Sequence, residues 1–144
     1  MPATMIPCLR YDDAPAAIDW LCRAFGFERG LIVPNDSGGI AHAQLVMRDA
    51  ARGDAMVMLG SATPQGEFGR FTAQPHETGG RSTQCPYIVI DAIDTHCERA
   101  AAAGAEMVMP IADQDYGGRV YTCKDPEGHL WCFGSYDPWA EGGA

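Results

Sequence analysis

The sequence has only one lysine, no run of basic residues, and ten basic side chains against nineteen acidic ones, so its formal net charge is −9. Proteins that bind nucleic acid usually present a basic face, because neutralising phosphates supplies most of their affinity. The composition therefore argues against nucleic acid as a partner. An acidic surface instead favours neutral or cationic small molecules.

The sequence also lacks any apolar stretch that approaches the roughly 20 residues needed to span a bilayer. Its first residues, Met1 to Met5, have neither the basic start nor the apolar run of a signal peptide. These absences predict a soluble, cytoplasmic protein that does not associate with a membrane.

The six cysteines include no Cys-x-x-Cys pair, and a chain of 144 residues does not need disulfides to fold. Each cysteine lies in a segment with the pattern of a strand or a helix. We therefore expect reduced thiols that act as small hydrophobic side chains. They are Cys8, Cys22, Cys85, Cys97, Cys123 and Cys132.

What is present is the composition of a globular protein, with 47% hydrophobic and 20% charged residues. A length of 144 residues predicts one domain, residues 1–144. A chain of this size buries roughly two-thirds of its unfolded surface, which is enough for an ordinary core.

Two helices are predicted, over residues 14–25 and 92–103, because apolar residues recur in each at the spacing of one helix face. An aspartate can cap each start and a glycine can end each helix. These residues correspond at a constant shift: Asp13 (or Asp12) and Asp91 as caps, Gly26 and Gly104 as stops, and Glu28 and Glu106 after them.

Strand patterns surround both helices in the same order, which predicts an α+β fold of two βαβββ units. The first unit (1–60) has strands near 5–10, 28–33, 40–48 and 54–59. The second (85–144) has strands near 86–90, 106–111, 119–124 and 129–135. Between the units, the linker 61–84 has little periodicity, and its Phe68 and Phe71 either close over a ligand or pack on a sheet edge.

Residues 125–128, Asp-Pro-Glu-Gly, have the preferences of a type I turn and predict a hairpin of the last two strands. Counting outward from the turn pairs Lys124 with His129 and Tyr121 with Cys132. Directly opposed residues share a face. One face is therefore expected to carry Tyr121, Cys123, Leu130 and Cys132, and the other face, packed on a helix, Trp131 and Phe133.

Two further tryptophans lie outside these strand patterns. Trp20 lies off the apolar stripe of its helix, which predicts partial exposure at an interface or rim. Trp139 lies in the C-terminal tail, where it either packs on a partner chain or frays with the tail.

The paired units, the start Leu9-Arg10-Tyr11-Asp12-Asp13, and the motifs Tyr116-Gly117-Gly118-Arg119-Val120-Tyr121 and Asp125-Pro126-Glu127-Gly128-His129-Leu130-Trp131 together carry a family resemblance. Over nearly its whole length the sequence resembles the vicinal oxygen chelate superfamily of glyoxalases, extradiol dioxygenases, fosfomycin-modifying enzymes and bleomycin-resistance proteins. It is most similar to the bleomycin-resistance-like branch, including thiocoraline-binding-type and PhnB-like members.

The resemblance implies half-barrel sheets around a cleft, and a dimer that often pairs units across chains. In the metalloenzymes of the family, four inward His, Glu or Gln side chains bind one divalent metal. The matching positions here hold Ile6, Met58, Cys85 and Cys132. Isoleucine cannot ligate, a thioether suits hard ions poorly, and two thiolates fall short of the three or four ligands that zinc takes.

The four histidines do not repair this site. His129 is expected on the strand face opposite Cys132, His96 lies on the second helix and His76 in the linker. Only His42 is on a strand that can face the cleft, where it is more simply a hydrogen-bonded or surface residue. We therefore expect no metal and no cofactor.

An apolar cleft would suit a flat, largely apolar ligand, since methionine adapts its shape and tyrosine offers a ring and a hydroxyl. Arg10, at the strand end, could bind an anionic group at the mouth. The alternative is that the side chains expected to line this cleft instead fill the interior of a closed sheet. The expected ligand-binding residues are Ile6, Cys8, Arg10, Met56, Met58, Cys85, Tyr87, Tyr121, Leu130 and Cys132.

The sequence thus predicts a homodimeric, metal-free protein that sequesters a hydrophobic or aromatic, antibiotic-like small molecule. The net charges of −2, 0 and −7 for residues 1–60, 61–84 and 85–144 favour a neutral or cationic one. One alternative is an enzyme that is metal-free or uses an unfamiliar metal site at Cys85 and Cys132, with Tyr121 as an acid. Another is a purely structural dimer with a filled core.

Overall fold

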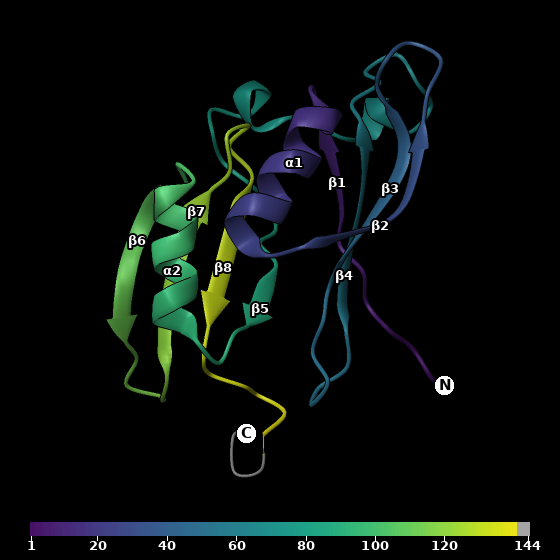
Figure 1. The fold of residues 1–144 in the computed structure, drawn as a ribbon. Coiled ribbons are helices and arrows are strands. Elements are labelled where there is room, and N and C mark those ends of the chain that lie inside the picture. Colours follow the sequence, from purple (N-terminus) through teal and green to yellow (C-terminus); the bar gives the residue numbers. More distant parts are fainter. Residues whose placement is uncertain (141–144) are drawn as a thin grey trace.

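The computed structural model describes residues 1–140, which form two βαβββ units (Figure 1). The first contains β1 (Cys8–Tyr11), α1 (Ala14–Phe25), β2 (Glu28–Pro34), β3 (Ile40–Met47) and β4 (Ala55–Ser61). The second contains β5 (Tyr87–Val89), α2 (Ile93–Ala102), β6 (Glu106–Asp113), β7 (Arg119–Lys124) and β8 (Leu130–Gly134). The predicted repeat is confirmed, with strand ends shifted by up to three residues.

Each unit builds one four-stranded mixed sheet, in the order β1-β4-β3-β2 for the first and β5-β8-β7-β6 for the second. The first and last strands of each unit pair in parallel, and the other pairs are antiparallel. The sheets do not close into a barrel. The predicted α+β class is therefore correct, and each half-barrel is an open sheet in the single chain.

The residues predicted to begin and end α1 do so, whereas the residue predicted to cap α2 does not. The Asp13 side chain accepts a hydrogen bond from Ala16 N, and Gly26 ends α1 in the left-handed conformation at φ 85°. At α2 the cap position is Ala92, which makes no side-chain cap bond. The prediction that Asp91 caps α2 is wrong, because its carboxylate binds Arg52 instead.

The two units share one hydrophobic core, and Figure 1 shows α1 and α2 on the same side of the two sheets. The Phe25 ring, at the end of α1, lies 5.2 Å from Trp131 and 4.7 Å from Phe133 of β8 between ring centroids. Trp20 is only 7% exposed, packs in this core, and donates its indole N–H to the Ala103 carbonyl at the end of α2. The expected exposure of Trp20 is therefore wrong.

The pairing of β7 with β8 differs by one residue from the count made on the sequence. Lys124 lies opposite Leu130, and Tyr121 lies opposite Phe133. The cause is Gly128, which has φ 89° and closes the turn by donating to the Asp125 carbonyl, so that Asp125 rather than Lys124 faces His129. Such a loop adds a bulge residue to one strand.

This shift changes which side chains share a face. Tyr121, Cys123, Trp131 and Phe133 lie together in the core, each 0% exposed. Thr122, Leu130 and Cys132 lie on the opposite face. The expected grouping of Tyr121 and Cys123 with Cys132 is therefore wrong, whereas the placement of Trp131 and Phe133 in the core is confirmed.

The turn at 125–129 also clamps the first unit. Both carboxylate oxygens of Glu127 accept backbone N–H groups at the start of α1, from Asp12 at 2.6 Å and Asp13 at 2.9 Å. His129 Nε2 lies 2.7 Å from the Arg10 carbonyl oxygen and donates to it. A turn of the second unit thus fixes the β1–α1 junction of the first.

Asp125 is the buried centre of this clamp, at 4% exposure. One carboxylate oxygen accepts from the Tyr11 hydroxyl at 2.6 Å and from the Trp131 indole N–H at 3.0 Å. The other accepts from the backbone N–H groups of Glu127 and His129. Every donor that faces this carboxylate is satisfied, as a buried charge requires.

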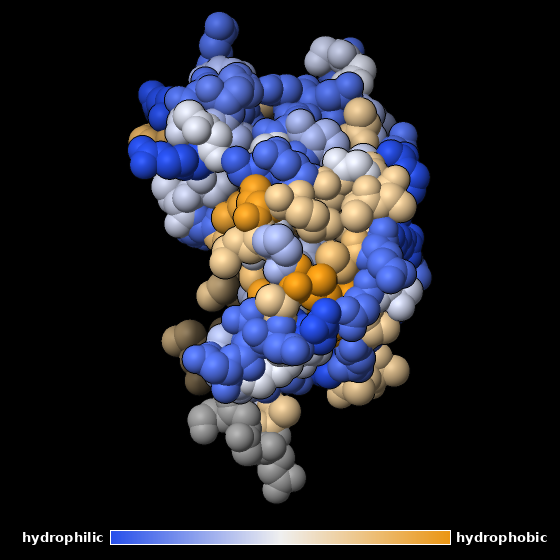
Figure 2. Space-filling view, turned by 90° about the vertical axis from the view of Figure 1, so that its left-hand side faces the viewer, coloured by the Kyte–Doolittle hydropathy of each residue, from blue (hydrophilic) through white to orange (hydrophobic). Residues whose placement is uncertain are grey.

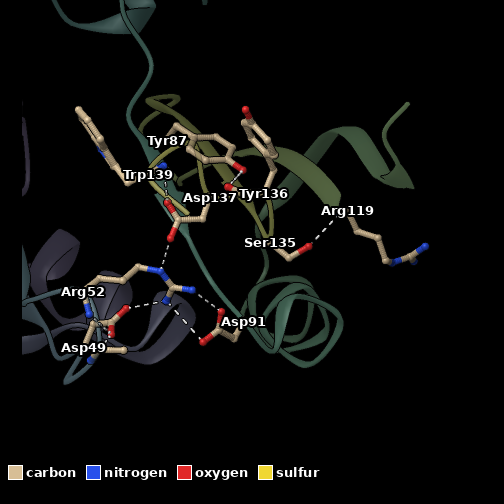
Figure 3. A network of polar contacts seen from close by, with 10 residues as sticks. Asp49, Arg52, Tyr87, Asp91, Arg119, Ser135, Tyr136, Asp137 and Trp139 are labelled. Atoms are coloured by element: carbon tan, nitrogen blue, oxygen red, sulfur yellow. Dashed lines mark hydrogen bonds and ion pairs between the residues drawn. The ribbon is translucent and has the colours of Figure 1, made fainter. Parts of the chain in front are cut away.

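At the other end of the molecule, Arg52 at the tip of the β3–β4 hairpin joins three segments (Figure 3). Its guanidinium pairs with Asp49 of the same hairpin at 2.9 Å, Asp91 before α2 at 2.6 Å, and Asp137 of the C-terminal tail at 2.7 Å. These hydrogen bonds raise the pKa of Arg52 and lower that of Asp137. The network ties the tail to both units.

In the variant Arg52→Ala we expect the backbone amides of Trp139 and Ala140 to exchange with solvent at least about tenfold faster, because both donate to Asp137. Hydrogen exchange followed by NMR measures this. The matched control is Arg48→Ala in the same hairpin, because Arg48 pairs with other carboxylates. Unchanged tail exchange in Arg52→Ala would show that the tail is held without this network.

The linker is less structureless than its composition suggests. It contains two short 3-10 turns, Gly69–Phe71 and Pro75–Glu77. Phe68 and Phe71 are 55% and 79% exposed, and the Phe68 ring lies against Arg10. Within residues 1–140, no helix combines the length and hydrophobicity that a membrane crossing requires.

Candidate functional site

Each sheet has one face packed in the core and one face without a helix over it, which we call its open face. On the first sheet the core face carries residues such as Ala43, Leu45 and Leu59. Strand alternation therefore places the intervening residues on the open face. They include Cys8 and Arg10 of β1, His42 and Gln44 of β3, and Met56 and Met58 of β4.

A row of three open-face residues crosses the first sheet. Cys8 lies opposite Met58 in the parallel pair, and Met58 lies opposite Gln44 in the antiparallel pair. On the second sheet the corresponding row is Tyr87, Cys132 and Thr122. The two units thus present equivalent rows of mostly sulfur-containing and aromatic side chains.

The structure brings together most of the predicted ligand-binding residues, but on two separate sheets. Cys8, Arg10, Met56 and Met58 share the open face of the first sheet, and Tyr87, Leu130 and Cys132 that of the second. Ile6 and Cys85 precede β1 and β5 and lie outside the strands. Tyr121 lies on the core face, so its prediction as a cleft residue is wrong.

The two grooves that stand out in the described chain are not lined by this set as a whole. One, of about 450 Å³, lies between α1 and the 125–129 turn and includes Trp20 and Glu127. The other, of about 610 Å³, lies between the β3–β4 hairpin and β5 and reaches only Tyr87 of the predicted residues. Neither groove therefore encloses the predicted set of residues.

The metal site implied by the resemblance can be tested against the strand register. The lateral neighbours are Cys8 with Met58 and Tyr87 with Cys132, not Ile6 with Met58 and Cys85 with Cys132. Either set lacks histidine and carboxylate, and in residues 1–140 no three or more His, Cys, Asp or Glu side chains group as a metal site would require. These residues do not fit the family's divalent metal.

The groups beside Cys132 are neutral at physiological pH. Burial, with a smaller effect of Cys132, raises the pKa of the Cys85 thiol to about 11. Burial also raises the pKa of Tyr87 to about 12, and its hydroxyl donates to the Tyr136 carbonyl oxygen at 2.7 Å. A protonated thiol and a protonated phenol are poor nucleophiles.

Tyr121 is unavailable to the open face for the acid role considered above. Its hydroxyl lies 2.7 Å from Nδ1 of His96, and burial raises its pKa. The opposite ring nitrogen, Nε2, lies 2.8 Å from the Phe25 carbonyl oxygen, which can only accept. Neutral His96 therefore donates a hydrogen bond from Nε2 to Phe25 and accepts one at Nδ1 from the Tyr121 hydroxyl, which links the two units.

Between pH 7 and pH 5 we expect the free energy of unfolding of the wild type to fall more steeply than that of His96→Gln. Burial lowers the pKa of folded His96 below the unfolded value of about 6.5. Its stabilisation is therefore complete above that pH and is lost as the pH falls toward the folded pKa. Urea unfolding at each pH measures the difference, and parallel pH curves would contradict it.

Sequence reasoning missed two polar residues of the open faces, Gln44 and Thr122, and gave His42 little weight. His42 and Gln44 alternate with buried Ala43 and Leu45, and their side chains lie 3.1 Å apart. Strict alternation along 40–47 could have identified both. Thr122 required the correct hairpin register, which the bulge at Gly128 sets.

Three comparisons with known proteins bear on this fold. The family model of the glyoxalase/bleomycin resistance protein/dioxygenase superfamily matches residues 4–133. An uncharacterised protein of Mycobacterium tuberculosis H37Rv, Rv0887c, is 34% identical over 128 residues, which cover 89% of this chain and 71% of that protein.

Solved structures agree with the family model. TioX from Micromonospora sp. ML1 is 34% identical, with a TM-score of 0.66 over 92% of this chain and 98% of TioX. The fosfomycin resistance protein FosX from Mesorhizobium loti is 14% identical, with a TM-score of 0.62 over 94% of this chain and 92% of FosX, and shares the fold. Repeat, sheet topology and sequence similarity lead to one conclusion: the chain belongs to the glyoxalase/bleomycin resistance protein/dioxygenase superfamily.

Proposed function

We propose that this protein binds and sequesters a hydrophobic or aromatic, antibiotic-like small molecule without the help of a metal ion. The observation that supports this proposal is the chemistry of the open faces. Their central rows carry Cys8, Met58, Tyr87 and Cys132 where a metal-dependent site needs several histidines or carboxylates.

This chemistry favours a flat, largely apolar ligand. Methionine is unbranched and polarizable, so Met56 and Met58 can follow the outline of a ring system. Tyr87, which is 39% exposed, adds an aromatic ring. Small-molecule sites are mostly apolar with a few polar groups that fix orientation, and Gln44 and Thr122 supply such groups here.

We propose further that the complete site forms between two copies, with the first sheet of one facing the second sheet of the other. Within one chain the two open faces belong to separate sheets that do not close into a barrel. An apolar band bordered by hydrophilic residues crosses the β6 side of the molecule (Figure 2). Val108 and Met109 of β6 are exposed, and so is Trp139 of the tail, at 93%. Apolar surface of this kind is typical of association.

The acidic second unit, with a net charge of −7 over residues 85–144, favours a ligand that is neutral or cationic overall. The six cysteines are free thiols, which agrees with a reducing, cytoplasmic location. FosX is named as a fosfomycin resistance protein, and at 14% identity it shows the fold alone. We include a role in antibiotic resistance in the proposal because the matching family model is that of a superfamily that includes bleomycin resistance proteins.

A thermal-shift screen of aromatic antibiotics and neutral or cationic dyes tests the binding proposal. A ligand at 100 times its Kd adds about 2.7 kcal/mol, which raises the melting temperature by several degrees. Met58→Arg on the open face should abolish the shift, and Met5→Arg, at a 93% exposed position outside the strands, should leave it intact. A screen in which no compound raises the melting temperature would favour a purely structural protein.

Two further measurements separate the parts of the proposal. Metal analysis of the purified protein should find no stoichiometric Zn, Ni, Mn or Fe, and its presence would overturn the metal-free mechanism. Light scattering should give twice the 15.5 kDa chain mass. A monomer would remove the shared site. For a cationic ligand, affinity should fall with salt more than for its neutral analogue.

A further inference from the structure

Arg10 differs from the other half-buried arginine in how its charge is compensated. Arg119, also half-buried, pairs with Asp94 at 3.0 Å and Asp113 at 2.9 Å. The Arg10 guanidinium makes no hydrogen bond and no ion pair with any residue from 1 to 140, although the chain has nineteen acidic residues. A half-buried guanidinium without a partner in residues 1–140 has its N–H donors available for a partner from outside the chain.

Two contacts hold this guanidinium in position without using its N–H groups. Arg10 lies opposite Gly60 of β4, and a side chain at position 60 would collide with Arg10 Nη1. The Phe68 ring of the linker lies 5.2 Å from Arg10 Cζ, at cation–π distance. The guanidinium is thus packed between Gly60, which has no side chain, and the Phe68 ring. Its N–H donors remain free.

The surroundings of Arg10 have the polarity of a ligand site with one charged end. Ala43 lies opposite Leu59, so the next pair along the antiparallel ladder brings His42 beside Gly60. The row that follows along the sheet is Cys8, Met58 and Gln44. A molecule on this face would therefore meet cationic and polar groups at one end and apolar side chains beyond them.

We propose that Arg10 is the recognition point for an oxyanion, such as a carboxylate or sulfonate, carried by an aromatic ligand. This inference rests on the proposed binding function and names the ligand class more narrowly. The planar guanidinium fork matches two oxygens of one anionic group. The ring of the ligand then lies over Met58 and Cys8. A ligand with a compensating amine carries this group while remaining neutral or cationic overall.

Two fluorescent probes that share a ring system separate this inference from the function on which it rests. 8-Anilinonaphthalene-1-sulfonate carries the oxyanion, and N-phenyl-1-naphthylamine lacks it. Titration of the full-length protein should show that Arg10→Gln weakens binding of the sulfonate at least about tenfold and binding of the amine less than about twofold. Added salt should weaken sulfonate binding to the wild type and have little effect on the variant.

The matched control is Arg70→Gln. Arg70 lies beside Phe71 in the same linker, 5.4 Å from its ring, but it is exposed and paired with Glu67. The Arg70→Gln variant should bind both probes as the wild type does. Near-UV circular dichroism shows that each variant keeps its tertiary packing, since a loosened fold also binds the sulfonate.

Each outcome of the probe titrations either supports or contradicts an oxyanion site at Arg10. Equal weakening of both probes by Arg10→Gln, or no weakening of either, overturns the oxyanion site while leaving aromatic binding intact. Equal losses in Arg10→Gln and Arg70→Gln show a general charge effect and also overturn it. Failure of the wild type to bind either probe contradicts both the inference and the proposed function.

Discussion

Asp125→Ala should lower the free energy of unfolding by about 3–5 kcal/mol, the cost of removing one partner from a buried charged network. The substitution leaves the Tyr11 hydroxyl and the Trp131 indole N–H without an acceptor, and both side chains are at most 1% exposed. Burial and the Asp125 charge raise the pKa of Tyr11, so its hydroxyl stays protonated and needs that acceptor. Urea denaturation measures the loss.

Asp125→Asn should cost less, about 1–3 kcal/mol, because one oxygen still accepts while the amide group meets donors that it cannot satisfy. The control is Asp36→Ala, an exposed aspartate in the β2–β3 turn, which should change stability by no more than about 0.5 kcal/mol. Similar losses for Asp125→Ala and Asp36→Ala would contradict the clamp. A loss in Asp125→Asn as large as in Asp125→Ala would show that charge, rather than acceptor geometry, dominates.

Phe25→Ala should also cost about 3–5 kcal/mol, because it removes a ring that is 1% exposed at the junction of the two units. The ring packs on Trp20, Trp131 and Phe133, with centroids 5.0, 5.2 and 4.7 Å away. Since the core is shared, both units should lose stability together. Fluorescence and far-UV circular dichroism should therefore report one coincident unfolding transition.

The matched control for this variant is Phe71→Ala, in which the deleted ring is 79% exposed. Its stability should stay within about 0.5 kcal/mol of the wild type. A two-step transition in Phe25→Ala, with one half of the chain unfolding first, would show that the units are stable separately.

Local signals in the sequence were sufficient for much of the fold. The apolar stripe of α1, its Asp13 cap and the Gly26 stop predict the helix to the residue, because all three act within one or two turns of the chain. The repeat then extends the same reasoning to the second unit. Asp91 departs from the analogy because its carboxylate binds a distant arginine, Arg52, and makes no cap bond to α2.

The site was harder to predict because it depends on strand register. A one-residue bulge at Gly128 moves Tyr121 from the expected open face into the core, since alternate strand residues point to opposite faces. Glycine after Asp-Pro-Glu was a sign of this bulge that could have been used. The role of Asp125 and Glu127 as a clamp depends on contacts more than 110 residues away, which no local pattern encodes.

Sequence similarity identifies the family, whereas the function within the family depends on the side chains of the open faces. Family membership is shown by the match over residues 4–133 and by the similarity to TioX. The family contains both enzymes and resistance proteins, so the choice between them depends on the open faces. Our proposal of ligand binding rests there on Met58, Cys132 and the unpaired Arg10, and the probe titrations test whether the ligand carries an acid.

The contacts of the 125–129 turn with the β1–α1 junction imply that the two halves can stay together without an intact linker. Tyr11, Asp12 and Asp13 bind a turn that lies more than 110 positions later, so the halves are held by side-chain and backbone contacts rather than by the peptide that joins them. A protease cut at the exposed Phe68–Phe71 segment should leave a nicked but native molecule. Two separately expressed fragments, 1–68 and 69–144, should reassemble on mixing, which makes this small chain a candidate for fragment complementation.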